Sequence, residues 1–118
     1  MTDTLKRLAE RFPSKFAYHG AFFNPDDVGT IRLVGVVEDG KEKVVFIPDL
    51  TSDDYDEMAG LLGYEFEVVK LKVLESWDFR AWPVKVPLDV LQTDELYPTK
   101  RLASIAAFQA IAERELSK

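Results

Sequence analysis

The sequence predicts an α+β fold: a single domain over residues 1–118 in which three helices pack on a largely antiparallel, five-stranded sheet. Apolar residues recur at helical spacing in three segments and alternate as in strands in five, in the order α-β-β-β-α-β-β-α. Strands and helices are therefore grouped rather than strictly alternating, which favours antiparallel pairing. At 118 residues the chain also has the usual length of one domain.

The first half of the chain predicts one helix followed by a three-stranded meander. The helix spans about residues 3–12 and ends before Pro13, which cannot continue it. Its apolar residues at helical spacing are Leu5, Leu8 and Phe12. The strands are predicted over residues 16–23, 30–38 and 43–48. Asp39-Gly40 is a typical hairpin turn between the last two strands.

A second helix is predicted over residues 52–62. Thr51 can cap this helix, with Asp54 at its third position, and Gly63 is typical of the residue that follows a helix. The predicted inward stripe consists of Tyr55, Met58, Ala59 and Leu62. The many acids in its first turns are explained by the helix dipole, which favours negative charge there.

A strand is predicted over residues 64–74. Its apolar residues are even-numbered up to Val68 and odd-numbered from Val69 onward. A pattern of period two that slips by one residue predicts a β-bulge at this pair.

A fifth strand is predicted over about residues 79–88 at the edge of the sheet. Pro83 and Pro87 lack the N–H group that a central strand donates, and their spacing directs both to the same side. Alternation then places one set of side chains in the core and the other outside. The predicted core set is Trp82, Val84, Val86 and Leu88. The predicted outer set is Trp77, Phe79, Ala81, Pro83, Lys85 and Pro87.

A last helix is predicted to be opened by Pro98, Thr99 and Lys100 and to run to about residue 116. Its predicted inward residues are Leu102, Ile105, Phe108, Ile111 and Ala112. Four alanines of this helix favour close packing on a neighbour, namely Ala103, Ala106, Ala107 and Ala110.

The net charge of −6 is unevenly distributed along the chain. Residues 1–15 and 100–118 each carry +2, whereas residues 16–99 hold 17 acids and 7 bases, hence −10. Nucleic-acid binding is disfavoured, because it depends mainly on Lys and Arg. The chain has no cysteine, which excludes disulfides, thiolate metal sites and cysteine nucleophiles. We expect a cytoplasmic protein without membrane contact, since neither a spanning segment nor a secretory signal is recognisable.

The order of elements and the acidic charge resemble those of the small acidic dimeric chaperones of type III secretion. This resemblance covers the whole chain as topology and charge and includes no residue motif. A homodimer is also expected from the residues themselves, because apolar side chains occupy both faces of segments 31–37 and 44–47. A second copy related by twofold symmetry can cover the face that three helices leave bare.

The aromatic cluster Trp77-Asp78-Phe79-Arg80-Ala81-Trp82 is the predicted partner-binding site. Trp and Arg are enriched among binding hot spots. On an edge strand, Trp77 and Phe79 would form an apolar patch beside Arg80. The first functional hypothesis is therefore a non-enzymatic protein-binding module, such as a chaperone, an inhibitor or an immunity-type protein. The acidic middle of the chain favours a basic protein partner. No cofactor and no catalytic residue are predicted.

A divalent-metal-dependent phosphodiesterase or nuclease is the alternative. Residues 58–65 resemble the helix-to-strand motif of the LAGLIDADG homing endonucleases, which implies Glu65 as a metal-binding acid. Phe66 stands where that motif has glycine, and Gly63 stands where it has an earlier acid. The close approach of small residues on an ordinary helix is the competing explanation.

A second carboxylate pattern supports the same alternative. Asp49 followed by Glu65 and Glu67 resembles nucleases that pair an acid with Asp/Glu-x-Lys, although Lys70 stands three residues after Glu67 rather than two. Paired carboxylates are what hard cations require. A third hypothesis is mimicry of nucleic-acid charge, which requires the −10 segment to form one continuous face. His19, the single histidine, is interpreted as structural.

Overall fold

The computed structural model describes residues 2–24, 29–38, 41–46, 50–93 and 95–118, with side chains described for residues 3–18, 50–93 and 95–118. The chain divides into two compact units, Met1–Leu50 and Thr51–Lys118. In the described residues both units combine helices with antiparallel strands, which confirms the α+β class and the three helices. The prediction of a single domain over residues 1–118 stays a prediction.

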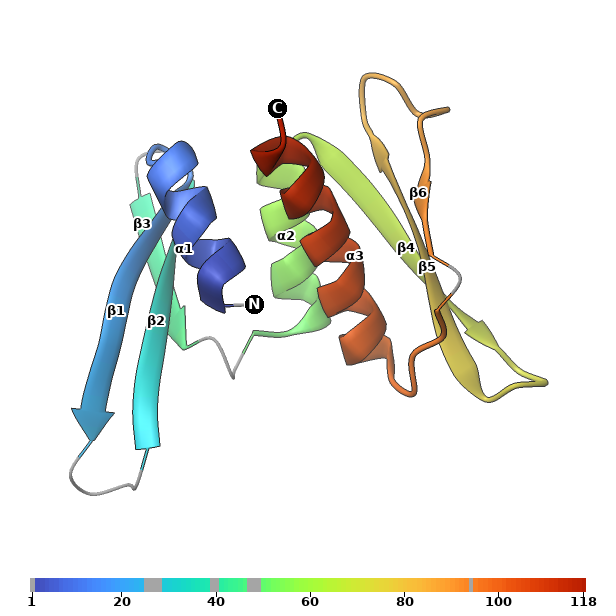
Figure 1. Cartoon of the computed structure of the whole chain (residues 1–118), viewed down its shortest axis with the longest axis horizontal. Helices are drawn as coiled ribbons and strands as arrows, with labels where there is room; N and C mark the ends of the chain where they lie inside the picture. Colours follow the sequence, from blue (N-terminus) through green and yellow to red (C-terminus); the bar gives the residue numbers. More distant parts are fainter. Residues whose placement is uncertain (1, 25–28, 39–40, 47–49, 94) are drawn as a thin grey trace. The chain divides into compact units, whose positions relative to one another are not determined.

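The first unit consists of one helix and a three-stranded meander (Figure 1). Its elements are α1 (Thr2–Arg11), β1 (Phe16–Asn24), β2 (Gly29–Glu38) and β3 (Lys41–Phe46), with the antiparallel strand order β1-β2-β3. Leu5 and Leu8 of α1 are fully buried. The pairing of β1 with β2 shifts register between Tyr18 and Gly20. The side chain of His19 and the Asp39-Gly40 turn lie outside the described residues.

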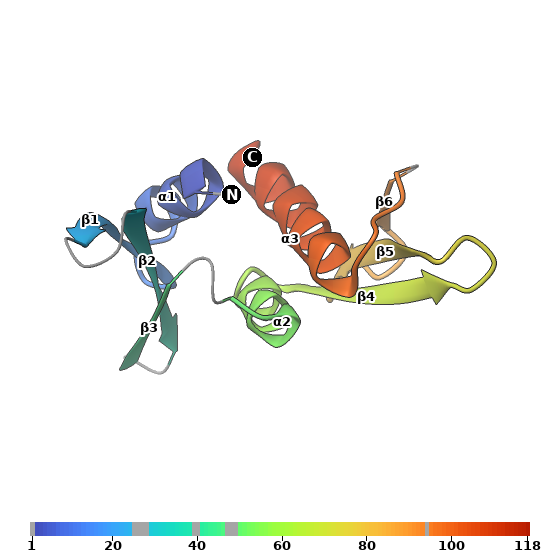
Figure 2. The ribbon, with the colours of Figure 1, turned by 90° about the horizontal axis from the view of Figure 1, so that it is seen from below.

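The second unit packs two helices against a sheet. Its elements are α2 (Ser52–Leu61), β4 (Tyr64–Leu71), β5 (Ser76–Pro83), β6 (Leu91–Gln92) and α3 (Lys100–Leu116). The sheet is antiparallel with the order β4-β5-β6. Figures 1 and 2 show α3 running along this sheet, and α3 contacts α2, β4 and β5.

The ends of both helices in this unit are fixed by the residues that the sequence indicates. Thr51 forms a capping box with Asp54: the N–H of Asp54 donates to Oγ1 of Thr51 (3.2 Å), and the N–H of Thr51 donates to Oδ2 of Asp54 (2.8 Å). Gly63 follows α2 with a φ of +84°, in the left-handed region that glycine adopts without strain. Thr99 caps α3 by accepting from the N–H of Leu102 (3.1 Å).

The core of the second unit lies between the helices and one face of the sheet. Its buried apolar residues are Tyr55, Met58, Ala59, Leu62, Tyr64, Phe79, Ala81, Ala103, Ala107, Phe108, Ile111 and Ala112. The rings of Tyr55 and Phe108 lie 5.7 Å apart and join α2 to α3. Burial of one such side chain contributes roughly 2 kcal/mol. The predicted stripe of α2 is confirmed, whereas Leu102, predicted to face inward from α3, is 43% exposed.

The described residues form two sheets of three strands each rather than one sheet of five. β6 has no counterpart in the sequence prediction, because two residues are too few for alternation to be recognised. β6 pairs with β5, so β5 is central and the prediction of an edge strand is wrong. Pro83 is the last residue of β5 and Pro87 lies beyond it, so neither removes a hydrogen bond from the middle of the ladder.

The predicted bulge at Val68 and Val69 is also wrong. The pairing of β4 with β5 runs without interruption from Tyr64 opposite Pro83 to Leu71 opposite Ser76. Val69 therefore points away from the core, on the outer face of the sheet, and remains 44% exposed. The change from even-numbered to odd-numbered apolar residues therefore does not mark a bulge. It reflects an apolar side chain, Val69, on the outer face of a regular strand.

The predicted facing of β5 is reversed. Phe79 is 3% exposed and Ala81 is fully buried, so the residues expected outside belong to the core. They lie opposite Val68 and Phe66 of β4, on the face that α3 covers. The prediction that Trp82, Val84, Val86 and Leu88 face the core is wrong because β5 ends at Pro83, and three of these four residues follow the strand. These three, Val84, Val86 and Leu88, are exposed.

Candidate functional site

A groove of about 340 Å³ lies between α3 and the chain that runs beside β5. It belongs entirely to the second unit. Its lining residues are Phe79, Gln92, Thr93, Glu95, Tyr97, Ala106, Gln109, Ala110 and Glu113. Among the features that the described residues form, this groove has the shape expected of a site for a partner's side chains.

The strand-side wall of the groove begins at β6 and ends at Tyr97, and we call this part of the chain the return segment. β6 pairs with Arg80 and Ala81, and the next pairing joins Trp77 to Tyr97. Two positions of β5, 78 and 79, separate these two pairings, against four positions of the other segment, of which 93, 95 and 96 are described. Such extra residues bend a strand away from its partner and are common beside functional sites. The hollow opens where the return segment leaves β5.

Hydrogen bonds hold both ends of this bulge. Trp77 and Tyr97 exchange two backbone hydrogen bonds, of 2.7 Å from the N–H of Trp77 and 2.9 Å from the N–H of Tyr97. Within the bulge, the N–H of Glu95 donates to Oγ1 of Thr93 (3.1 Å). The N–H of Phe79 donates to Oδ1 of Asp78 (2.8 Å). Backbone hydrogen bonds therefore tie this wall to β5 at Trp77.

The helix-side wall is a single stripe of α3. Ala106, Gln109, Ala110 and Glu113 recur at the spacing that places residues on one face of a helix. Two members of the stripe are alanines, whose short side chains leave the hollow unfilled. The floor is aromatic: the rings of Phe79 and Tyr97 lie 6.2 Å apart. An apolar floor between polar rims is typical of binding sites for protein segments.

The charge around the groove has one sign. Its two charged lining residues, Glu95 and Glu113, are both acidic, and no Lys or Arg of the described residues lines it. Burial raises the pKa of Tyr97, and the negative charges of Glu95 and Asp78 raise it further. Residues 51–118 hold 13 acids and 8 bases, hence −5 of the net −6. The groove therefore lies in a negative field.

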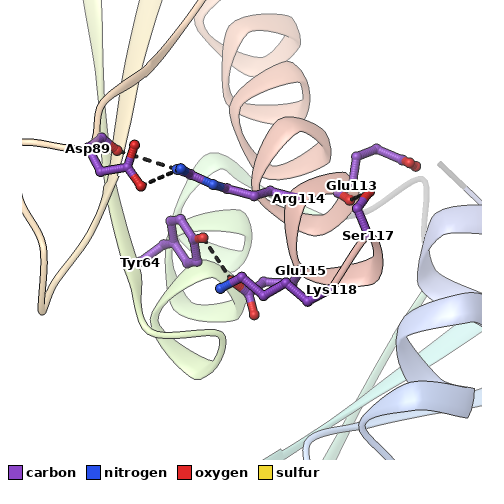
Figure 3. A network of polar contacts seen from close by, with 7 residues as sticks. All are labelled: Tyr64, Asp89, Glu113, Arg114, Glu115, Ser117 and Lys118. Carbon is purple, nitrogen blue, oxygen red and sulfur yellow. Dashed lines mark hydrogen bonds and ion pairs between the residues drawn. The ribbon is translucent and has the colours of Figure 1, made fainter.

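A polar network fixes the last turns of α3 (Figure 3). The hydroxyl of Tyr64 donates to Oε1 of Glu115 (2.8 Å), and Nζ of Lys118 donates to the same oxygen (2.7 Å). The guanidinium of Arg114 forms an ion pair with the carboxylate of Asp89. Burial, together with the hydrogen bond to Glu115, raises the pKa of Tyr64 to about 12. Burial favours a higher pKa for Glu115, but the hydrogen bonds from Lys118 and Tyr64 outweigh it and lower that pKa.

The structure separates the three residues predicted to bind a partner. Phe79 lies in the floor of the groove, and Trp77 holds the return segment through its backbone. Arg80 is exposed and points to the outer face, opposite Glu67 of β4. Sequence reasoning missed Glu95, Tyr97 and the alanine stripe as site residues. The spacing of Ala106 and Ala110 was the available signal, but small residues indicate close packing as readily as a hollow.

The carboxylates of the alternative hypothesis lie elsewhere. Glu65 and Glu67 are exposed on the outer face of β4, and Asp49 lies outside the described residues. Over residues 50–93 and 95–118, and in the described part of the first unit, no three or more His, Asp or Glu side chains gather as a metal site would require. Within the same described residues, no helix has the length and apolar character needed to cross a membrane.

No protein-family model matches this chain, and neither a curated protein nor a solved structure matches it significantly.

Proposed function

We propose that this protein is a small, non-enzymatic protein-binding module that holds a segment of a partner protein in the groove between α3 and the bulged return segment. The observation that carries the proposal is the hollow itself, which lies between α3 and a segment that backbone hydrogen bonds tie to β5 at Trp77. A preformed site binds without the entropy cost of ordering its own loops.

The composition of the groove supports a peptide ligand. Tyr97, which is half-buried, offers aromatic surface, and Tyr is among the residue types most enriched in binding hot spots. Ala106 and Ala110 leave room for side chains of the ligand. Gln92, Thr93 and Gln109 supply amide and hydroxyl groups at the rim, which can pair with the backbone of an extended segment.

We also propose that the module acts as a homodimer. The support is an exposed apolar turn after β5, formed by Val84, Val86, Leu88 and Val90. This turn is fixed by hydrogen bonds from the N–H of Val86 to the carbonyl of Pro83 (3.1 Å) and from the N–H of Asp89 to the carbonyl of Val86 (3.0 Å). Arg114 also anchors it at Asp89. Rigid exposed apolar patches mark contact surfaces, and twofold pairing is the commonest way to cover them.

Selection of peptides from a displayed random library against the full chain tests the module. We expect enriched peptides whose binding to Ala110→Phe, which fills the groove, is at least tenfold weaker. Val73→Phe is the matched control, because it adds the same ring at a side chain that is almost fully exposed in the β4–β5 turn. If no peptide is enriched, or if the enriched peptides bind Ala110→Phe as tightly as wild type, the proposal is wrong.

A further inference from the structure

We propose that the segment bound in the groove is basic: it presents a Lys or Arg side chain, flanked by apolar residues, to the end of the groove at Tyr97 and Glu95. This inference rests on the proposed function and specifies the chemistry of the partner.

The Tyr97 end of the groove combines the two features that recognise a cationic side chain. The first is negative charge, since Glu95 is exposed at this end and Asp78 is near enough to influence the hydroxyl of Tyr97. The second is aromatic surface, which the half-buried ring of Tyr97 provides. A cation above an aromatic ring is stabilised by about 0.5–1 kcal/mol at exposed sites.

The remainder of the groove suits the rest of such a residue. Lys and Arg carry their charge on an apolar stem that packs along apolar surface while the charged head stays in water. Ala106, Ala110 and Tyr97 provide this surface beside the charged end. Apolar neighbours in the ligand would find the same floor, so the preferred segment alternates apolar and basic residues.

Two other described surfaces carry charges of both signs. On the outer face of the sheet, Arg80 lies opposite Glu67, so positive and negative charges are mixed there. A second groove, beside α1 in the first unit, is lined by both Lys6 and Glu10. The α3 groove is lined by carboxylates and by no Lys or Arg of the described residues, and the surrounding unit carries −5.

Three labelled nonapeptides test the inference by fluorescence anisotropy. They share Gly/Ser ends and differ at the centre, which is Val-Lys-Val, Val-norleucine-Val or Val-Glu-Val. Norleucine keeps the apolar stem of Lys and removes its charge. We expect the Lys peptide to bind the wild-type chain about fivefold more tightly than the norleucine peptide, and the Glu peptide to bind most weakly. The advantage of Lys should shrink as NaCl is raised from 50 to 500 mM.

Two isosteric variants locate the effect. Glu95→Gln should reduce the advantage of Lys to about twofold or less, whereas Glu67→Gln, which removes the same charge on the outer face, should leave it unchanged. Equal binding of the three peptides that is still lost in Ala110→Phe overturns the basic preference and leaves the proposed function standing. A Lys preference that Glu67→Gln removes and Glu95→Gln does not would overturn the assignment to this groove. Absence of binding by all three peptides would overturn both proposals.

Discussion

The hydroxyl of Tyr64 donates a 2.8 Å hydrogen bond to Glu115 and thereby joins the first residue of β4 to the last turn of α3. Tyr64 is buried, and Glu115 also accepts from Lys118 (2.7 Å). The contact bridges 51 positions of the chain. It fixes the helix that forms one wall of the groove against the sheet that supports the other wall.

This contact predicts a loss of stability at alkaline pH. The pKa of Tyr64 is raised from 10.0 to about 12, so the contribution of its neutral form is complete below pH 10 and is lost as the pH rises towards 12. We expect Tyr64→Phe to lower the free energy of unfolding by about 1 kcal/mol at pH 8, through the lost hydrogen bond. Between pH 10 and 11 the wild type should lose most of this advantage, since one shifted proton contributes about 1.4 kcal/mol per pH unit.

Urea unfolding of wild type and Tyr64→Phe at several pH values between 8 and 11 measures this difference. A difference in the free energy of unfolding that stays constant over this range would contradict the raised pKa of Tyr64.

Substitution by alanine at two glycines near the end of α2 should change the stability of the fold in opposite directions. Gly60 is helical, and no described atom lies within 4 Å of the position that a Cβ would take. Gly60→Ala should therefore stabilise the fold by about 0.5–1 kcal/mol, because alanine favours the helix. Gly63 has equal room but a φ of +84°, so Gly63→Ala should destabilise by about 1–2 kcal/mol.

Thermal unfolding of the two variants checks these signs. The empty space at Gly60 shows that this glycine is not required for close approach to a described neighbour. Stabilisation by Gly63→Ala would show that the left-handed conformation at this position is wrong.

The facing of β5 predicts which aromatic residue supports the fold. Phe79 is in the core, so Phe79→Ala should cost about 3 kcal/mol or more. Trp82 is half-buried on the outer face, and Trp82→Ala should cost about 1 kcal/mol. Denaturant unfolding of the two variants measures these costs. If Trp82→Ala lowered the free energy of unfolding more than Phe79→Ala does, the facing of β5 predicted from alternation would be correct instead.

The exposed turn after β5 predicts the oligomeric state. Leu88 is 94% exposed at this turn, so Leu88→Asp should leave the stability of one chain within about 0.5 kcal/mol of wild type. Burying an unpaired charge in a dimer contact is costly, so the variant should sediment as a monomer while the wild type sediments at twice the mass of one chain. A wild type that sediments as one chain at micromolar concentration would refute the homodimer.

Local signals in the sequence identified the helices and most strands. Capping by Thr51 and Asp54, the stop at Gly63 and the cap at Thr99 each involve neighbours in sequence, so residue types alone reveal them. The observed bounds of the three helices lie within a few residues of the expected ones. The meander of β1, β2 and β3 followed from turn residues between alternating segments.

The errors concern β5 and its surroundings, where the outcome depends on contacts distant in sequence. Apolar residues occupy both faces of the segment from Trp77 to Leu88, so alternation alone could not choose the buried face. The choice is made by α3, which covers Phe79 and Ala81. The groove could not be predicted at all, because it arises from the unmatched lengths of β5 and its return segment.

The central claim is that the groove beside α3 receives the partner segment. An NMR titration of the isotope-labelled full chain with the Val-Lys-Val peptide tests it most directly. The account predicts that backbone amide shifts concentrate at residues 92–97 and 106–113, and that Ala110→Phe abolishes them while Val73→Phe preserves them. Shifts concentrated on the outer face, at Glu65 to Val69 and Arg80, with the groove residues unmoved, would contradict it.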